Sequence, residues 1–245
     1  MSMIVTTVVP EGIVMAADSS LLTFKMMDVI NFFKGNTEEA IKNTLLGTCT
    51  YEKENIVGNK VITRSARKLH VMKENNIAIS DGNQRNIGNK SIAPYIDFFC
   101  QNNNFDNPKS CAEGLFNFIK DLGQNIKAVY HVCGYNMFLN IPQPEFWYVD
   151  IVNNMIMDAV GDAKYGISFC GANEYFTQYM SLINKNITSY SLQDAIDVSL
   201  FAMDMSIKLE RFIDREELIL PPIDLLVIEP DGVKWIQQKT LKVGG

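Results

Sequence analysis

The first eighteen residues constrain this chain most, because they have the pattern of two buried strands joined by a turn. β-branched residues run from Ile4 to Val9, and Pro10-Glu11-Gly12 has the composition of a turn. An apolar run then returns from Ile13 to Ala17. The pattern predicts a β-hairpin that begins with Ser2 at the open end of a rigid sheet.

Ser2 carries the most reactive combination of groups that this hairpin offers. A small second residue permits removal of Met1, which would leave Ser2 with both a hydroxyl and a free α-amino group. An α-amino group titrates near ~7.7–8.0, so it is partly neutral at cytoplasmic pH and can act as the general base for the hydroxyl. Ser2 is therefore a candidate for a complete nucleophile and base in one residue.

The composition excludes several other kinds of chemistry. The chain has only two histidines, His70 and His131, so there are few candidates for the base of a histidine-containing catalytic triad. Its five cysteines have neither CxxC nor metal-ligand spacing, which favours buried thiols over disulfides or a zinc site, and we expect no metal and no cofactor. A net charge of −6 argues against nucleic acid and anionic membranes as partners. With neither an apolar run of membrane-spanning length nor a signal peptide, we expect a cytoplasmic protein.

The segment from Gly12 to Asp18, a glycine followed by three apolar residues and then Ala16-x-Asp18, resembles the opening of proteasome β-type subunits and their bacterial relatives. These are N-terminal-nucleophile hydrolases, in which an aspartate follows the first mature residue by sixteen positions, as Asp18 follows Ser2. The family nucleophile is threonine, which makes Thr6 and Thr7 alternatives. Neither follows a glycine, and Thr7 precedes Asp18 by only eleven positions, so we interpret both as ordinary strand residues.

A second hairpin is predicted from residues 65–73, a turn at 74–76 and a return strand at 77–83. A lysine that begins one strand and a glycine that closes the next, fourteen positions later, are similar to the family pattern, and here they are Lys68 and Gly82. The resemblance implies that the Lys68 ammonium lies beside Ser2 and lowers the pKa of the nucleophile, while Asp18 keeps Lys68 charged. It also implies that the Gly82 N–H faces the developing oxyanion, and that the missing side chain leaves room for substrate.

Two further positions are assigned supporting roles by the resemblance. Cys170 and Gly171 occupy the place of a serine-glycine turn that supports the nucleophile's amine, and we interpret Cys170 as structural because a thiol is a weak donor. Glu210 stands where the family has an aspartate near that amine. The alternative for Glu210 is a solvated residue at a helix end.

The remaining chain alternates between helical and strand patterns. Apolar periodicity and caps predict the helices 86–102, 110–124, 172–184 and 191–213, and the strands 127–135, 146–152 and 154–160, with two last strands in 218–235 joined by a Pro-Asp-Gly turn. Asp150 and Asp158 are interpreted as turn or strand-end residues. Residues 20–57, with a short helix capped by Thr37, form an insertion that the family lacks. It is interpreted as a lid, an oligomer contact, a specificity wall or a surface decoration.

The Pro221-Pro222 segment is most similar to the bacterial Anbu branch of the family, whose KYGKP signature is retained only as Lys164-Tyr-Gly-Ile. The chain is thus identified as a divergent relative. The resemblance implies a single α+β domain over 1–245 with the four-layer αββα sandwich, two antiparallel sheets face to face and helix pairs outside.

The resemblance implies an amide-bond hydrolase, a proteasome-like peptidase that acts on peptides or proteins as a homo-oligomeric ring or spiral. A small-molecule amidase and a catalytically inactive structural subunit remain as alternatives, because serine replaces the preferred threonine. Whether an ATPase partner exists is left open.

Overall fold

The structure, a computed structural model, describes residues 3–24, 60–63, 66–74, 76–83, 86–87, 90–122, 126–171, 187–212 and 219–239. The chain divides into two compact units, Met1–Ser20 with Arg64–Gly245, and Leu21–Thr63. In the smaller unit, strands β3 (Leu21–Phe24) and β4 (Lys60–Thr63) pair antiparallel. The rest of the predicted insertion, including the helix capped by Thr37, lies outside the described residues. A single domain with an insertion at 20–57 stays a prediction.

The predicted N-terminal hairpin is confirmed, and it forms the centre of a five-stranded antiparallel sheet in the larger unit. Strands β1 (Met3–Val9) and β2 (Gly12–Ala17) are buried at every position. The strand order is β12-β1-β2-β13-β14, with β12 (Gly166–Gly171), β13 (Asp224–Glu229) and β14 (Gly232–Gln237). Because both faces of β1 and β2 are covered, apolar residues are required at successive positions rather than at alternate ones.

The second sheet is also five-stranded and antiparallel. Its order is β11-β10-β9-β6-β5, and its strands are β5 (Leu69–Val71), β6 (Ile77–Asn83), β9 (Ala128–Phe138), β10 (Ile141–Asp150) and β11 (Met155–Asp158). The predicted hairpin through residues 74–76 is therefore confirmed as β5 and β6. Asp150 and Asp158 end their strands and accept backbone hydrogen bonds from Asn153 and Gly161, as interpreted.

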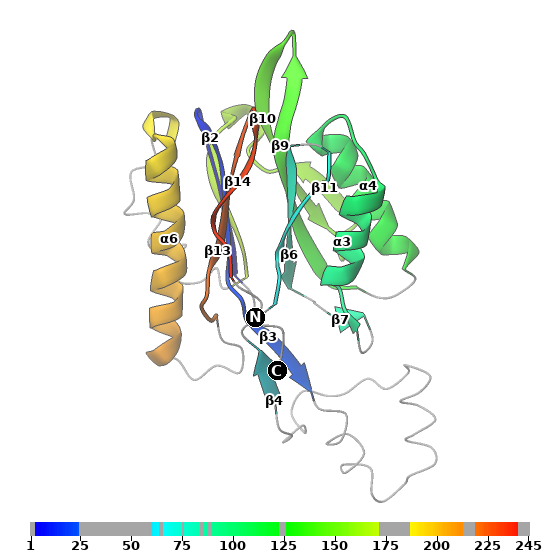
Figure 1. The fold of residues 1–245 in the computed structure, drawn as a ribbon, viewed down its shortest axis with the longest axis vertical. Helices are drawn as coiled ribbons and strands as arrows, with labels where there is room; N and C mark the ends of the chain where they lie inside the picture. Colours follow the sequence, from blue (N-terminus) through cyan, green and yellow to red (C-terminus); the bar gives the residue numbers. More distant parts are fainter. Residues whose placement is uncertain are drawn as a thin grey trace, which may run out of the picture. The chain divides into compact units, whose positions relative to one another are not determined.

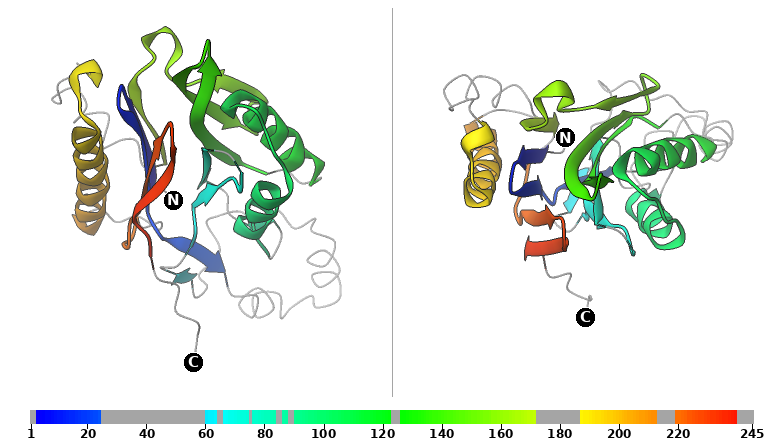
Figure 2. Two further views of the ribbon diagram at one scale, coloured as in Figure 1. Left: turned by 45° about the horizontal axis from the view of Figure 1, so that its top comes forward. Right: turned by 90° about the horizontal axis from the view of Figure 1, so that it is seen from above.

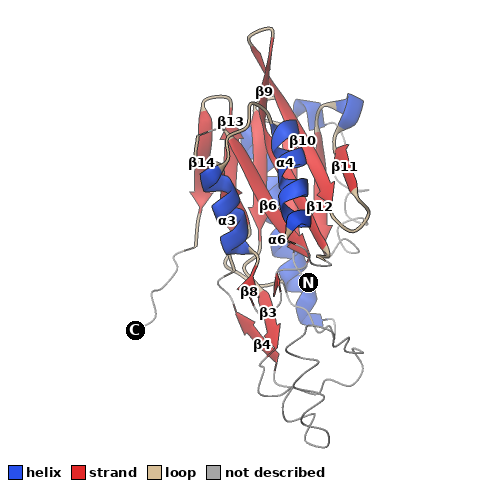
Figure 3. Ribbon diagram, turned by 90° about the vertical axis from the view of Figure 1, so that its right-hand side faces the viewer, coloured by secondary structure: helices blue, strands red, loops and turns tan. Residues whose placement is uncertain are grey.

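The two sheets pack face to face through an apolar core. Ile4, Ile13 and Met15 of the first sheet share this core with Ala78 and Phe146 of the second. Helix α6 (Leu192–Leu209) covers the outer face of the first sheet, and helices α3 (Ala93–Asn102) and α4 (Pro108–Asp121) cover that of the second (Figures 1 and 2). Figure 3 shows α3 and α4 in front of the second sheet.

The α+β class and the two antiparallel sheets are thus as predicted. The helix expected at 172–184, which would pair with α6, lies outside the described residues. The complete four-layer sandwich with two helices on each side therefore stays a prediction.

Helix ends follow the caps in the sequence. The Asn107 side chain accepts a hydrogen bond from the Ser110 nitrogen at the start of α4, and Ser191 and Asp194 form a reciprocal capping box at the start of α6. The helix predicted at 86–102 begins only at Ala93. Before it, β7 (Asn86–Ile87) and β8 (Lys90–Ser91) pair as a short hairpin.

Strands β9 and β10 extend beyond the predicted ends at Tyr135 and Phe146. They continue as a two-stranded ribbon to a turn at Leu139 and Asn140, past the stretch of β10 that pairs with β11 (Figure 1). Pro142 and Pro144 lie in this ribbon, where β10 has only one neighbour. A proline is tolerated there because no third strand needs its missing N–H.

Among the helices that the structure describes, none has the length and apolar character needed to cross a membrane.

Candidate active site

Asp18 is the fully buried residue that follows the last residue of β2. Its Oδ1 accepts a hydrogen bond from the Met3 nitrogen at 2.9 Å. Its Oδ2 accepts from the nitrogen and the hydroxyl of Ser20, at 2.9 and 2.5 Å. The hairpin brings Asp18 opposite the start of β1, and these donors compensate the burial of the carboxylate.

Lys68 lies one residue before β5 and is as fully buried as Asp18. Its ammonium Nζ forms a hydrogen-bonded ion pair with Asp18 Oδ1, and both side chains have 0% exposure. Breaking such a pair by removing one partner costs about 3–5 kcal/mol, because the other charge stays buried alone. The structure thus brings together two predicted site residues from different sheets.

Ser2 lies outside the described residues, but its covalent neighbour Met3 lies within them. The Met3 nitrogen is the nitrogen of the Ser2–Met3 peptide bond, and it donates to Asp18 Oδ1. Since Lys68 Nζ contacts the same oxygen, the charged pair touches the backbone directly after Ser2.

Gly82 lies inside β6, opposite Val129 of β9. The nitrogen of the preceding residue, Asp81, donates to the Lys68 carbonyl at 2.9 Å. Because successive N–H groups of a strand face opposite neighbours, the Gly82 N–H faces β9. The oxyanion role of Gly82 stays a prediction. It requires this N–H to turn away from β9 toward the substrate.

The reason for a glycine at this position differs from the one expected from the sequence. A Cβ built on Gly82 would lie 2.7 Å from Cys170 Sγ and 3.2 Å from Ile4 Cδ1. The space that a side chain would need is therefore filled by the protein's own core, and it is not left open for substrate.

Cys170 and Gly171 were predicted to form a turn, and this is wrong. They are the last two residues of β12 and pair with Ile4 and Met3 of β1. Strand β12 ends at Gly171, whose φ of 113° favours glycine. Cys170 is buried and packs in the core between the sheets, in keeping with its interpretation as structural.

Glu210 lies at the C-terminal end of α6 and is only 3% exposed. The alternative of a solvated helix-end glutamate is therefore wrong. Whether Glu210 supports the Ser2 amine stays a prediction.

Thr6, Thr7 and the two histidines have interior partners. Thr6 Oγ1 lies 2.9 Å from His131 Nδ1, and Thr7 Oγ1 lies 2.8 Å from Ser199 Oγ, in keeping with ordinary strand residues. Burial lowers the pKa of His131 to about 3, so its ring is neutral at physiological pH. His70 Nδ1 lies 2.7 Å from Asp97 Oδ1 on the α3 side of the second sheet.

Sequence reasoning missed a second charged group beside Asp18. Ser19, Asp224 and Lys239 are joined by hydrogen bonds in the larger unit. The sequence contains one indication of this group, because Asp224 is the single charged residue in the otherwise apolar run 223–228.

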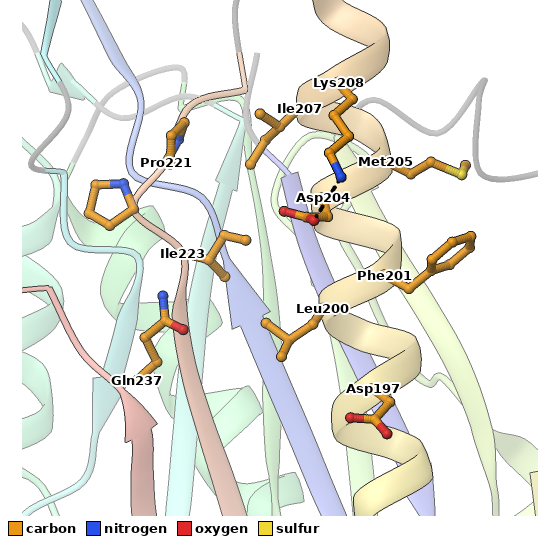
Figure 4. A pocket seen from close by; sticks show the side chains of 11 residues that line it. Asp197, Leu200, Phe201, Asp204, Met205, Ile207, Lys208, Pro221, Ile223 and Gln237 are labelled. Carbon is orange, nitrogen blue, oxygen red and sulfur yellow. Dashed lines mark hydrogen bonds and ion pairs between the residues drawn. The ribbon is translucent and has the colours of Figure 1, made fainter.

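A groove of about 820 Å³ lies between α6 and the segment that leads into β13 (Figure 4). It is lined mainly by apolar side chains, among them Leu200, Phe201 and Ile223, with an ion pair of 3.2 Å between Lys208 and Asp204 at its edge. Neither Asp18 nor Lys68 lines it. The buried charges therefore identify a better candidate site than this groove does.

Within the described ranges, no three His, Cys, Asp or Glu side chains lie together in a way that could hold a metal ion. The four described cysteines, Cys100, Cys111, Cys133 and Cys170, are free and buried.

Comparisons with known proteins show which solved structures have a similar fold. Searches with the sequence matched no protein-family model and no curated protein. Solved structures do match: a Gly-1 mutant of Anbu from Hyphomicrobium sp. strain MC1 has a TM-score of 0.60 and 12% identity over 98% of this chain and 87% of that one. Anbu from Yersinia bercovieri, described as an ancestral beta-subunit, has a TM-score of 0.59 and 13% identity over 96% and 87%. The predicted resemblance to Anbu, as a divergent relative, is confirmed at the level of the fold.

Proposed function

We propose that this protein is an N-terminal-nucleophile amide hydrolase, a proteasome-like peptidase that uses Ser2 after Met1 is removed. The observation that carries the proposal is the buried Asp18–Lys68 ion pair, whose carboxylate also binds the nitrogen that follows Ser2. Packed apolar residues of similar volume are often as stabilising as a buried ion pair. Stability alone therefore gives little reason for two buried charges at this point, and chemistry at Ser2 gives one.

In the proposed reaction, Ser2 Oγ attacks the substrate carbonyl carbon while the Ser2 α-amine takes the hydroxyl proton. The Lys68 ammonium stabilises the charge that develops on Oγ, and Asp18 holds that ammonium in place. The Gly82 N–H is assigned to the oxyanion, and this assignment requires the amide to turn away from β9 toward the substrate. The amine half of the substrate leaves with the proton from the Ser2 ammonium, and water then hydrolyses the ester on Ser2.

The proposal includes a homo-oligomer that acts in the cytoplasm on peptides or proteins, with the cleft enclosed by a ring or spiral. The similar Yersinia protein is described as a beta-subunit, a term for one part of an assembly. The role of the segment 20–57 stays a prediction.

The first test is the intact mass of freshly purified protein, followed by labelling with a peptide β-lactone. We expect the mass of a chain that begins at Ser2, and one adduct that maps to Ser2. Ser2→Ala removes the adduct, and Lys68→Met slows labelling about a hundredfold or more, because it removes charge stabilisation and positioning. Lys73→Met is the matched control, since Lys73 is an exposed lysine just after β5.

The outcomes separate the three functions. Cleavage of fluorogenic peptides supports the peptidase, whereas turnover of small acyl amides alone supports an amidase. A retained Met1 with no labelling would contradict both and support a structural subunit.

A further inference from the structure

A second buried ion pair, between Lys239 and Asp224, contacts Ser19, which is the residue after Asp18. Asp224, the first residue of β13, pairs with Ala17 of β2 and is 1% exposed. Its carboxylate forms an ion pair with Lys239 Nζ, whose side chain is 6% exposed, and it also accepts the Lys239 nitrogen at 2.8 Å. Two buried charged pairs thus lie at the ends of neighbouring strands.

The ammonium of Lys239 has three acceptors for its three N–H groups. Besides Asp224 Oδ2, these are the Ser19 hydroxyl, at 3.0 Å, and the Ala66 carbonyl oxygen. Ser19 Oγ in turn donates to the Pro222 carbonyl at 2.5 Å. With all three hydrogens engaged inside the protein, Lys239 has none left for a substrate.

These acceptors connect Lys239 with both members of the candidate catalytic pair. Ser19 is the residue after Asp18, and Ala66 lies two residues before Lys68. The Ala66 nitrogen also donates to the Ser19 carbonyl at 3.1 Å, so the two chain segments are joined directly. A single buried ammonium therefore ties the end of β2 to the approach to β5.

We propose that Lys239 and Asp224 are positioning residues that hold Asp18 and Lys68 in register beside Ser2. The inference rests on the proposed function, because it assigns Lys239 a role in that reaction. Loss of the Lys239 ammonium releases the chain at Ser19 and Ala66. The side chains of the nearby Asp18 and Lys68 then lose their alignment. Displacements of this kind lower reaction rates strongly even when substrate binding is intact.

The first experiment needs no activity: amide hydrogen exchange by NMR in the wild type and in Lys239→Met. The amides of Met3 and Ser20 report on Asp18, because both donate to its carboxylate. We expect both to exchange about tenfold faster or more, with Val14 and Ile79 unchanged within about twofold. A merely structural role would speed all four amides together, and unchanged Met3 and Ser20 amides would overturn the proposal.

The second experiment measures kcat and KM, or the rate and affinity of Ser2 labelling. In Lys239→Met the kcat falls about tenfold or more, with KM within about twofold. Lys239→Arg restores part of kcat because it keeps the charge. The double variant Lys239→Met with Asp224→Asn removes both charges, so that no buried charge is left alone, and we expect it to fold and to keep the kcat defect.

Lys234→Met is the matched control, because Lys234 is an exposed lysine on β14 that pairs with Glu229. A wild type that neither cleaves substrates nor reacts at Ser2 would contradict the proposed function, and amide exchange then decides the positioning role by itself. A double variant with full kcat would overturn that role while leaving the proposed function intact.

Discussion

Individual residues in this protein are constrained mainly by what faces them across the two sheets. Gly82 and Cys170 show this, because the absence of a side chain on β6 matches a thiol on β12. Thr6 and His131 form the polar counterpart, a hydrogen bond between strands of opposite sheets.

Gly82→Ala is expected to destabilise the protein by about 1–3 kcal/mol, because overpacking forces Cys170 to shift. Cys170→Ala removes the sulfur atom 2.7 Å from the new Cβ, so the double variant should recover part of this loss. Urea unfolding of both single variants and the double variant measures the coupling. Strictly additive effects would show that the two sites do not interact.

His131 is expected to make the free energy of unfolding depend on pH in the acidic range. Its pKa is about 3 in the folded protein and near 6.5 when unfolded, so only the unfolded chain takes up a proton between these values. Stability should therefore fall with decreasing pH below about 6.5, by up to about 1.4 kcal/mol per pH unit from this residue.

The measurement is urea unfolding from pH 7 to pH 4 in the wild type and in His131→Gln, which does not titrate there. We expect a shallower loss of stability in the variant. Equal slopes would show that the His131 ring is protonated in the folded state.

Secondary-structure elements could be predicted where local pattern and tertiary environment agree. The continuous apolar run of β1 and β2 and the capping residues Asn107 and Ser191 specify their elements directly. The β9–β10 ribbon was missed because prolines such as Pro142 and Pro144 are rare inside strands, and they are tolerated here only because no third strand pairs with this part of β10. The Asp18–Lys68 pair was implied by the family resemblance, through the separations from Ser2 to Asp18 and from Lys68 to Gly82, whereas nothing in that resemblance points to the pair of Asp224 and Lys239.

At the start of α6, Ser191→Ala is expected to cost about 1 kcal/mol, because it removes the hydroxyl oxygen that accepts a hydrogen bond from the Asp194 nitrogen. Ser191→Thr keeps a hydroxyl and should stay close to the wild type. Thermal or urea unfolding measures both. An alanine variant as stable as the threonine variant would mean that the cap contributes little to α6.

The whole molecule protects its interior thiols through the packing of helices and sheets. Cys100 and Cys111 are buried residues of α3 and α4 in the core between these helices and the second sheet, and Cys133 lies in the core between the two sheets. Burial raises the pKa of Cys100 to about 12 and raises the pKa values of Cys111 and Cys133 as well. Thiolate, the reactive form, is therefore scarce at all three positions.

We expect iodoacetamide at pH 8 to leave Cys100, Cys111 and Cys133 unmodified in the native protein and to modify them together in urea. Peptide mapping by mass spectrometry distinguishes the sites. Modification of Cys133 alone under native conditions would show that the sheets separate without global unfolding.

The hydrogen bond from the Ala66 nitrogen to the Ser19 carbonyl has a consequence for how such a chain can evolve. It joins the two points between which residues 21–63 leave and re-enter the larger unit. Doubling the length of a loop with fixed ends costs only about 0.6 kcal/mol of closure entropy. This segment can thus be lengthened, shortened or exchanged in descent while the buried pair of Asp18 and Lys68 keeps its place.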